Sequence, residues 1–293
     1  MYLIIGGTGS FGSRYAKHLV DRGQRVRIFS RDELKQFELR KVLNADYRIG
    51  DIRDYDAIRD AVRGVTVVIH AAALKHVLTG EQFPQEAIKT NVLGTENVVN
   101  AAKAEGVGRL VFLSTDKACS PVNTYGATKM LAERLVVQAG YNAVRYGNVM
   151  GSRGSVLHLF NEQMQHGAFR ITDRRMTRFA VTFAYAISLV ETALQADPGE
   201  IIVGKPPTFR IVDLCEAFDP DARIVETGPG PGEKLHEALL TEYEAARAID
   251  LYDHFCLRQD VGGHLQAELK AYTSADGLPM SVKEIRGMIS EVL

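Results

Sequence analysis

The chain has 293 residues, of which 46% are hydrophobic and 24% charged, and its formal net charge is −1. This composition predicts a globular protein with one large domain and a lobe, or with two domains. The nearly balanced charge argues against a nucleic-acid partner and against binding to an anionic membrane.

The three cysteines, Cys119, Cys215 and Cys256, are scattered and lack the spacing of metal ligands. We therefore predict no metal site and a reducing, cytoplasmic compartment. No apolar run approaches the ~20 residues that a membrane span needs. Residues 1–5 run into glycines without a basic leader, so we do not expect a secretion signal there.

The first expected elements are a buried strand at residues 2–5, a glycine-rich turn and a helix at residues 13–22. The turn has the spacing G-x-x-G-x-x-G, which permits close backbone approach, and the helix N-terminus offers free N–H groups to a pyrophosphate. The flanking strand and helix favour a dinucleotide-binding turn over an ordinary one. We predict cofactor contacts from Gly6, Thr8, Gly9, Ser10, Phe11 and Gly12.

A second strand is expected at residues 25–29. Ser30 follows it, at the position where an acidic residue usually binds the ribose of a cofactor without a 2′-phosphate. Arg31 and Lys35 then remain to meet a 2′-phosphate, which a planar guanidinium matches well, so we predict NADP. In the alternative interpretation, Asp32 binds the ribose hydroxyls of NAD.

Strands are also expected at residues 46–49 and 65–70. Asp51 and Ile52 follow the first of them and are expected to bracket an adenine, although Asp51 could instead cap the next helix. Small residues follow the other strand and let the backbone approach the cofactor: Ala71, Ala72 and Ala73. Lys75 is expected to contact a phosphate of cofactor or substrate, and a role for the neighbouring His76 stays open.

The central stretch follows a buried strand expected at residues 108–113. Residues 114–117, Ser-Thr-Asp-Lys, would lie at its C-terminal end, where ligands bind in open α/β sheets. Tyr125 and Lys129 lie four residues apart at the start of a predicted helix, hence on one face. A lysine ammonium beside a phenol lowers the pKa of the phenol. The resulting phenolate can act as the general base when an alcohol is oxidised. The other interpretation is an exposed helix face.

The remaining pattern predicts helices at 91–102, 180–196 and 281–293 and strands at 142–146 and 200–203. Within the first of these helices, Asn91 could hydrogen-bond the active-site strand. This alternation predicts a doubly wound parallel α/β sheet of the Rossmann type. We predict that residues 1–147 and about 180–204 form the NADP-binding domain, and that about 148–179 and 205–293 form a smaller substrate-binding lobe. Arg178 and Lys234 would hold a diphosphate there, whereas Arg174 and Arg175 could be solvated. The expected substrate contacts are Lys75, Asn148, Ser155, Val156, Leu157, Arg178, Glu233 and Lys234.

The glycine motif, Asp51-Ile52, Asn91, Ser114-Thr115 and Tyr125 with Lys129 resemble the extended short-chain dehydrogenase/reductase family. Eight segments within about residues 2–237 are similar to UDP-N-acetylglucosamine 4,6-dehydratases, nearest to the inverting enzymes of pseudaminic acid biosynthesis. Leu78 stands where that family has proline, and the link before Asn142 is short. The segments are GGTGSFGSR, SRDELKQ, AAALKHV, STDKA, YGATK, VRYGNVMGSRGSV, MTRF and PGEKLHE.

The resemblance implies a redox-neutral dehydration of a UDP-sugar with NADP. Tyr125 takes the proton of the 4-hydroxyl, Lys129 lowers the Tyr125 pKa, and Thr115 hydrogen-bonds the same oxygen. Lys117 is implied as the base for the 5-proton and Asp116 as the acid for the departing 6-hydroxyl, which requires a lowered lysine pKa and a raised aspartate pKa. Ser114, Tyr125 and Lys129 are also expected to contact the cofactor.

Alternatives stay open at this point. They are a sugar-nucleotide epimerase, a retaining dehydratase of the same family, an NADP-sensing protein with a silent site, and a merely structural Asp116–Lys117 salt bridge. The helices near residues 91–103 and 126–138 resemble the pair through which this superfamily forms dimers, which implies a homo-oligomer.

Overall fold

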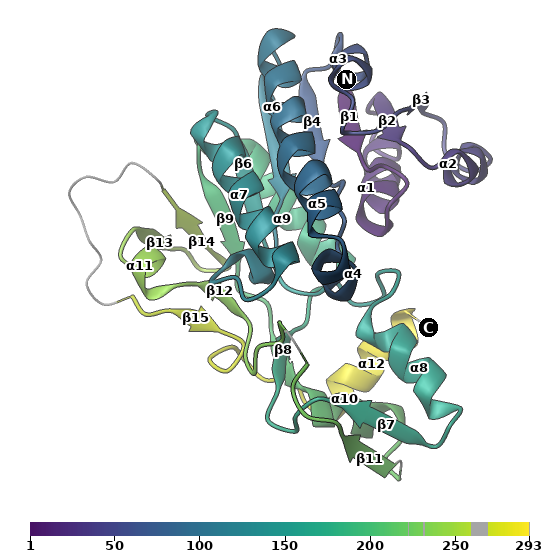
Figure 1. The fold of residues 1–293 in the computed structure, drawn as a ribbon, viewed down its shortest axis with the longest axis vertical. Coiled ribbons are helices and arrows are strands. Elements are labelled where there is room, and N and C mark those ends of the chain that lie inside the picture. The colour runs from purple at the N-terminus through teal and green to yellow at the C-terminus, as the bar shows by residue number, and fades with distance from the viewer. Residues whose placement is uncertain (222, 231, 259–268, 293) are drawn as a thin grey trace.

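The computed structural model describes residues 1–221, 223–230, 232–258 and 269–292, and within them a nine-stranded sheet forms the centre of the molecule (Figure 1). The strand order is β13-β14-β9-β6-β5-β4-β1-β2-β3. The strands from β3 to β9 run parallel, and β14 and β13 continue the sheet antiparallel. The strands are β1 (Tyr2–Ile5), β2 (Val26–Ser30), β3 (Asp46–Ile49), β4 (Val67–His70), β5 (Arg109–Leu113), β6 (Asn142–Arg145), β9 (Ile201–Gly204), β13 (Ala248–Asp250) and β14 (His254–Leu257).

The order 3-2-1-4-5-6 of the first six strands is that of a doubly wound nucleotide-binding fold, so the predicted fold class is confirmed. Strands β2, β6 and β9 are buried along their whole length, which explains their short, mostly apolar sequences. Parallel strands need crossover connections, and the helices that make them cover both faces of the sheet.

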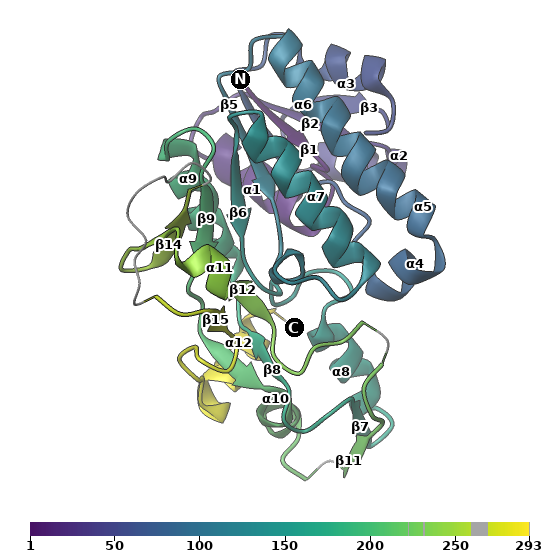
Figure 2. The same ribbon diagram turned by 60° about the vertical axis from the view of Figure 1, so that its left-hand side comes forward.

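Two helical layers enclose the sheet (Figures 1 and 2). On one face, apolar side chains of α3, α6 and α7 pack against the strands, as Ile58, Val98 and Val136 illustrate. On the other face, α1 and α9 pack through residues such as Leu19 and Leu189. The helices around the sheet are α1 (Ser10–Val20), α2 (Glu33–Arg40), α3 (Tyr55–Val62), α4 (Val77–Gln82), α5 (Pro84–Ala87), the π-helix η1 (Ile88–Leu93), α6 (Gly94–Ala104), the 3₁₀ turn η2 (Asp116–Ala118), α7 (Thr124–Gln138), α9 (Phe183–Gln195) and α11 (Glu242–Ala245).

A smaller lobe with its own core lies below the sheet in Figure 1. Phe160, Phe169, Leu214 and Ile285 are among its buried side chains. Strands β7 and β11 pair parallel, and β8 and β10 pair antiparallel. The lobe contains α8 (Val156–Met164), β7 (Ala168–Ile171), β8 (Thr177–Phe179), β10 (Thr208–Arg210), α10 (Ile211–Phe218), β11 (Arg223–Glu226) and α12 (Val282–Val292), while β12 (Ala238–Leu240) and β15 (Tyr272–Thr273) pair antiparallel near the large sheet.

One expectation needs correction. The predicted division put residues 205–293 in the smaller lobe, but β13 and β14 lie within that range and extend the large sheet, because β14 pairs with the free edge of β9. The segment predicted as a helix at residues 91–102 is helical, with residues 91–93 in the π-helix η1 and residues 94–102 in α6. The rest of the proposed domain division stays a prediction.

Within the described ranges, no helix has both the length and the apolar character that crossing a membrane requires.

Candidate active site

A cleft of about 290 Å³ lies where β1, β2, β3 and β4 reach their C-terminal ends. Eleven of the predicted cofactor residues line it: Gly6, Thr8, Gly9, Ser30, Arg31, Lys35, Asp51, Ile52, Ala71, Ala72 and Ala73. Asp32 and Arg153 line it as well. The strand order therefore brings together four segments that the sequence could only suggest one at a time.

The glycine turn forms the floor of this cleft. Gly6 has a φ of +80°, and a Cβ atom there would lie 2.7 Å from the backbone nitrogen of Ala72, so a side chain has no room. Gly9 caps α1 without a side-chain acceptor, and the first turn of α1 holds no acidic residue. The positive end of the helix dipole thus faces the cleft, which fits the pyrophosphate of a dinucleotide.

Polar groups at the end of β2 are tied to one another. The Thr8 hydroxyl donates to Ser30 Oγ at 3.1 Å. Asp32 caps α2, accepting from the backbone N–H of Lys35 at 2.9 Å, and its carboxylate also pairs with the Lys35 ammonium. Arg31 Nη1 lies 3.5 Å from Asp51 Oδ2, and its side chain is 63% exposed. The Asp32 carboxylate is therefore occupied, whereas Arg31 is open to solvent on the cleft wall.

Asp51 and Asn91 hold the walls of the cleft. Hydrogen bonds from Arg53 keep the Asp51 pKa below its ordinary value. Asn91 bridges Leu74 and Thr128: its Oδ1 accepts from Leu74 N at 2.8 Å, and its Nδ2 donates to Leu74 O and Thr128 Oγ1, each at 3.0 Å. Asn91 thus braces the loop after β4 against α7, where a bond to the active-site strand was expected.

Arg153 is a cleft residue that the sequence analysis missed. Its guanidinium donates to the Thr8 carbonyl and to Ser10 Oγ, and its own carbonyl accepts from Lys75 Nζ at 2.7 Å. The Arg153 guanidinium therefore contacts the glycine turn, and Lys75 is hydrogen-bonded to the Arg153 backbone. The motif G-S-R-G-S indicated that this arginine could contact backbone atoms elsewhere in the chain, because the flanking glycines leave room for a close approach. The motif did not indicate that those atoms belong to the glycine turn.

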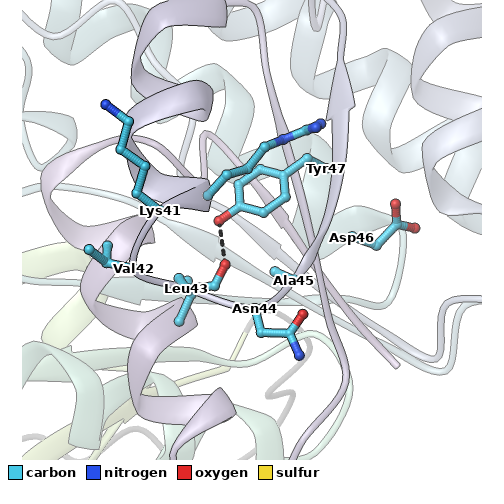
Figure 3. A pocket seen from close by; sticks show the side chains of 8 residues that line it. Lys41, Val42, Leu43, Asn44, Ala45, Asp46 and Tyr47 are labelled. Carbon is cyan, nitrogen blue, oxygen red and sulfur yellow. Dashed lines mark hydrogen bonds between the residues drawn. The ribbon is translucent and has the colours of Figure 1, made fainter.

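Another hollow, between α2 and β3, is shallow and holds none of the predicted site residues (Figure 3). Its lining is the continuous segment of residues 40–47, in which the Tyr47 hydroxyl donates to the Leu43 carbonyl at 2.9 Å. We interpret it as a surface loop.

The charged cluster of Asp116, Lys117 and Glu237 lies at the C-terminal end of β5. Lys117 Nζ is 3.1 Å from Asp116 Oδ1 and 3.0 Å from Glu237 Oε1. The Asp116 side chain is 1% exposed and that of Glu237 5%. Asn148 Oδ1 also accepts from Lys117 Nζ, at 3.5 Å. Glu237 comes from the segment before β12 and was not among the predicted site residues.

The electrostatics of this cluster agree with one expectation and contradict another. Burial raises the pKa of Asp116, with Glu237 adding to the rise and Lys117 opposing it. For Lys117, burial lowers the pKa, but the carboxylates of Asp116 and Glu237 outweigh burial and raise the pKa above its ordinary value. The expected low Lys117 pKa is therefore wrong for this arrangement, because the sequence did not reveal the second carboxylate.

Tyr125 lies in the first turn of α7, beside this cluster. Burial raises its pKa to about 12, while the Lys117 charge and a hydrogen bond from Thr115 oppose the rise. Lys129 donates to the Leu113 carbonyl and lies 3.8 Å above the Phe112 ring, and burial lowers its pKa to about 7. The groups that favour the phenolate are thus Lys117 and Thr115, where Lys129 was predicted.

Local backbone geometry fixes these side chains. Asn123 caps α7, its Oδ1 accepting from Gly126 N at 2.8 Å, and its Nδ2 donates to Gly232 O at 2.8 Å. Gly126 lies so close to the Lys117 carbonyl that a side chain would clash. Ser120 is held at a φ of +48° in the connecting loop, a conformation that non-glycine residues rarely adopt. The loop thus turns back onto its own strand end.

Only some of the predicted substrate residues lie near the cluster of Asp116, Lys117 and Glu237. Asn148 and Lys234 lie at the cluster, the latter 3.9 Å from Glu237 Oε2, and Arg178 donates to the backbone of Thr177 and Leu235. Leu157 is fully buried in the core of the smaller lobe, so its side chain is unavailable for substrate. Glu233 accepts from Gly230 N at 3.1 Å, within a loop whose residue 231 lies outside the described residues.

Ser155 precedes α8 with its hydroxyl buried and without a hydrogen-bond partner among the described residues, and Val156 begins the helix. The Ser114 hydroxyl is likewise buried and unpaired there. Over the described part of the chain, no group of acidic, histidine and cysteine side chains is arranged to hold a metal ion.

Comparisons with known proteins agree with this architecture. A family model described as polysaccharide biosynthesis protein matches residues 2–259. The chain is 41% identical over 276 residues to a UDP-N-acetylglucosamine 4,6-dehydratase (inverting) from Campylobacter jejuni, covering 88% of this chain and 83% of that protein. It is 39% identical over 321 residues to a UDP-glucose 4-epimerase from Rickettsia rickettsii, covering 98% and 94%.

Among solved structures, Pen from Bacillus thuringiensis superposes with a TM-score of 0.92 at 38% identity, covering 100% of this chain and 98% of that one. A dTDP-glucose 4,6-dehydratase from Streptomyces venezuelae, solved with NAD, reaches a TM-score of 0.71 at 19% identity, covering 80% and 86%, which is a likeness of fold.

Proposed function

The chain belongs to the polysaccharide biosynthesis protein family, and we propose that it is a sugar-nucleotide 4,6-dehydratase acting on UDP-N-acetylglucosamine. The product would be a UDP-6-deoxy-4-keto-hexosamine, inverted at the 5-carbon. The observation that carries the proposal is the buried Asp116–Lys117 pair, which lies beside Tyr125. Dehydration needs an acid and a base beyond the group that oxidises the 4-hydroxyl, and these two residues supply them.

The cleft residues fit a nicotinamide dinucleotide. The glycine turn and the N-terminus of α1 would hold the pyrophosphate, and the end of β2 the adenosine ribose. Such a cofactor would supply the hydride acceptor for the 4-carbon and the hydride donor for the 6-carbon. We propose NADP over NAD, because Asp32 is occupied in capping α2 while the guanidinium of Arg31 is exposed on the cleft wall.

Tyr125 would act first. Its phenolate oxygen takes the proton of the sugar's 4-hydroxyl, and the Lys117 charge and the Thr115 hydrogen bond favour that phenolate over the neutral phenol. The resulting 4-keto group acidifies the proton on the 5-carbon, which the second pair can then remove.

Asp116 and Lys117 would eliminate water. Transfer of one proton from Lys117 Nζ to Asp116 Oδ1, 3.1 Å apart, converts the ion pair to a neutral amine and a carboxylic acid. These are the forms that the two roles need: the amine takes the 5-proton and the acid protonates the departing 6-hydroxyl. The raised pKa of Asp116 favours the transfer, whereas the raised pKa of Lys117 opposes it. Delivery of a proton from solvent to the opposite face of the 5-carbon would give inversion.

A 4-epimerase is the second candidate, and the Rickettsia relative favours it because that protein matches nearly the whole chain. An epimerase needs no acid–base pair beyond the tyrosine, so Asp116 and Lys117 argue against it. Separate incubations with UDP-N-acetylglucosamine and UDP-glucose distinguish the two. The dehydratase predicts a keto-sugar with its alkaline absorbance from the first, whereas a 4-epimer of either substrate without keto-sugar would refute the proposal.

We further propose a cytoplasmic homo-oligomer with α6 and α7 at the subunit contact. Leu93 and Leu131, on η1 and α7, are 47% and 49% exposed, which supports a contact on this face.

A further inference from the structure

The Lys117 ammonium has as many acceptors as it has protons to donate. Its Nζ lies 3.0 Å from Glu237 Oε1, 3.1 Å from Asp116 Oδ1 and 3.5 Å from Asn148 Oδ1. A lysine ammonium carries three donors, so these oxygens can satisfy it completely. Glu237 supplies the shortest of the three contacts from a segment more than a hundred residues along the chain, and the mechanism above gives it no role.

Glu237 differs from the carboxylates of a structural ion pair in the same protein. Both carboxylate oxygens of Glu133 and both of Glu244 accept hydrogen bonds from the Arg145 guanidinium, at 2.5–3.0 Å. Glu237 Oε2 lies 3.9 Å from Lys234 Nζ but is buried without a hydrogen-bond partner among the described residues, and Asp116 Oδ2 is likewise buried without one. A buried acceptor that lacks a hydrogen bond is unfavourable for the folded state. The Lys117 cluster is therefore not arranged for stability in the way that the Arg145 cluster is.

We propose that Glu237 is a positioning residue for the acid–base pair: its carboxylate anchors the Lys117 side chain beside Asp116 and holds it as an ammonium, so that Glu237 governs when Lys117 can become a base. The inference rests on the proposed dehydratase function for its consequence in turnover. The anchoring itself can be tested without turnover.

The charge of Glu237 acts within a defined set of neighbours. The charged or titratable groups around the pair come from η2, α7, β8 and the loop before β12: Asp116, Tyr125, Arg178 and Lys234. Loss of the negative charge of Glu237 lowers the pKa of Asp116 and of Lys117, because that charge raises both. An opposite charge within hydrogen-bond distance shifts a pKa by about 1–3 units.

Glu237→Gln is the decisive variant, because it keeps an acceptor of the same shape and removes only the charge. We expect both limbs of the pH profile of kcat/KM to move to lower pH by about one unit or more. KM should change little, since Glu237 does not need to touch substrate. Glu237→Ala, which also removes the anchor, should lower kcat at least about tenfold more than Glu237→Gln does.

A second readout does not depend on activity. The rate at which acetic anhydride labels Lys117, followed by mass spectrometry over a range of pH, reports the fraction of neutral amine. Glu237→Gln should move that profile to lower pH in step with the kinetic limbs. Glu242→Gln, on the exposed start of α11, is the matched control and should leave both profiles unchanged.

The outcomes separate the two proposals. Coincident labelling profiles for wild type and Glu237→Gln would overturn the role of Glu237, whatever the enzyme makes. A shifted labelling profile in a protein that makes no keto-sugar would uphold the anchoring and refute the dehydratase. A shift in both readouts upholds both.

Discussion

Replacing Lys117 with methionine should destabilise the protein and make its stability depend on pH. Methionine keeps most of the side-chain volume but removes the ammonium that lies within 3.1 Å of both Asp116 and Glu237. These carboxylates have side chains only 1% and 5% exposed, so water cannot replace the lost partner. Removing one member of a buried ion pair costs about 3–5 kcal/mol.

The sign of the pH dependence follows from proton uptake. Without Lys117, the folded-state pKa of at least one carboxylate must rise further above its unfolded value, because two buried negative charges remain near each other. A carboxylate with a raised folded-state pKa favours the folded state at low pH and loses that contribution as the pH rises through the raised value. Each unit of pKa rise corresponds to about 1.4 kcal/mol. The deficit of the variant relative to wild type should therefore be larger at about pH 8 than at about pH 5.

Urea unfolding followed by circular dichroism at these two pH values measures the deficit. Lys89→Met is the control, because Lys89 is 55% exposed and its partner Glu86 is 43% exposed. That variant should change the free energy of unfolding by no more than about 0.5 kcal/mol at either pH. A Lys117→Met deficit that is equal at both pH values, or below about 1 kcal/mol, would refute the buried-cluster reasoning. The same variant should retain cofactor affinity and lose dehydration by a factor of about 10²–10⁴ or more.

Three further outcomes follow from the structure. Arg31→Asp should weaken NADP binding at least about tenfold and NAD binding far less, as measured by fluorescence titration, and equal losses would contradict the assignment of Arg31. Gly6→Ala should impair binding of either cofactor and lower stability by about 1–3 kcal/mol, because its φ is +80° and its Cβ would lie 2.7 Å from Ala72 N; unchanged binding would count against the glycine turn as the pyrophosphate site. Arg145→Met should reduce the free energy of unfolding by about 3–5 kcal/mol, because it leaves the buried carboxylates of Glu133 and Glu244 without their cation. Arg134→Met is the control and should change the free energy of unfolding by no more than about 0.5 kcal/mol, because the Arg134 side chain is 44% exposed. Similar losses in the two variants would show that burial does not decide the effect.

Strands and helices were predicted correctly where a local sequence pattern determines them. Residues 2–5 and 46–49 were predicted as strands and are β1 and β3 with those bounds. The helix expected at residues 13–22 begins at Ser10 instead, because the glycine turn leads directly into α1. Strands β13 and β14 were missed, because each is short and joins the sheet by pairing at its edge, which no local periodicity encodes.

The candidate site was likewise predictable only where its residues belong to a local motif. The glycine turn, Asp51-Ile52 and residues 71–73 each carry a local motif, and they meet in one cleft. No local motif specifies the contacts of Arg153 and Glu237, because their partners, the Thr8 carbonyl and the Lys117 ammonium, lie more than a hundred residues away in the chain. The missing carboxylate is also why the Lys117 pKa was predicted in the wrong direction.

Proton NMR of UDP-N-acetylglucosamine incubated with the purified protein in deuterated water would decide whether the protein is an inverting dehydratase. We predict a methyl signal from a 6-deoxy-4-keto-hexosamine, with deuterium at the 5-carbon and inverted configuration there. A methyl signal without inversion would contradict the proposed stereochemistry while keeping Asp116 and Lys117 as the eliminating pair. Unchanged substrate, or a 4-epimer without any methyl signal, would contradict the dehydratase itself.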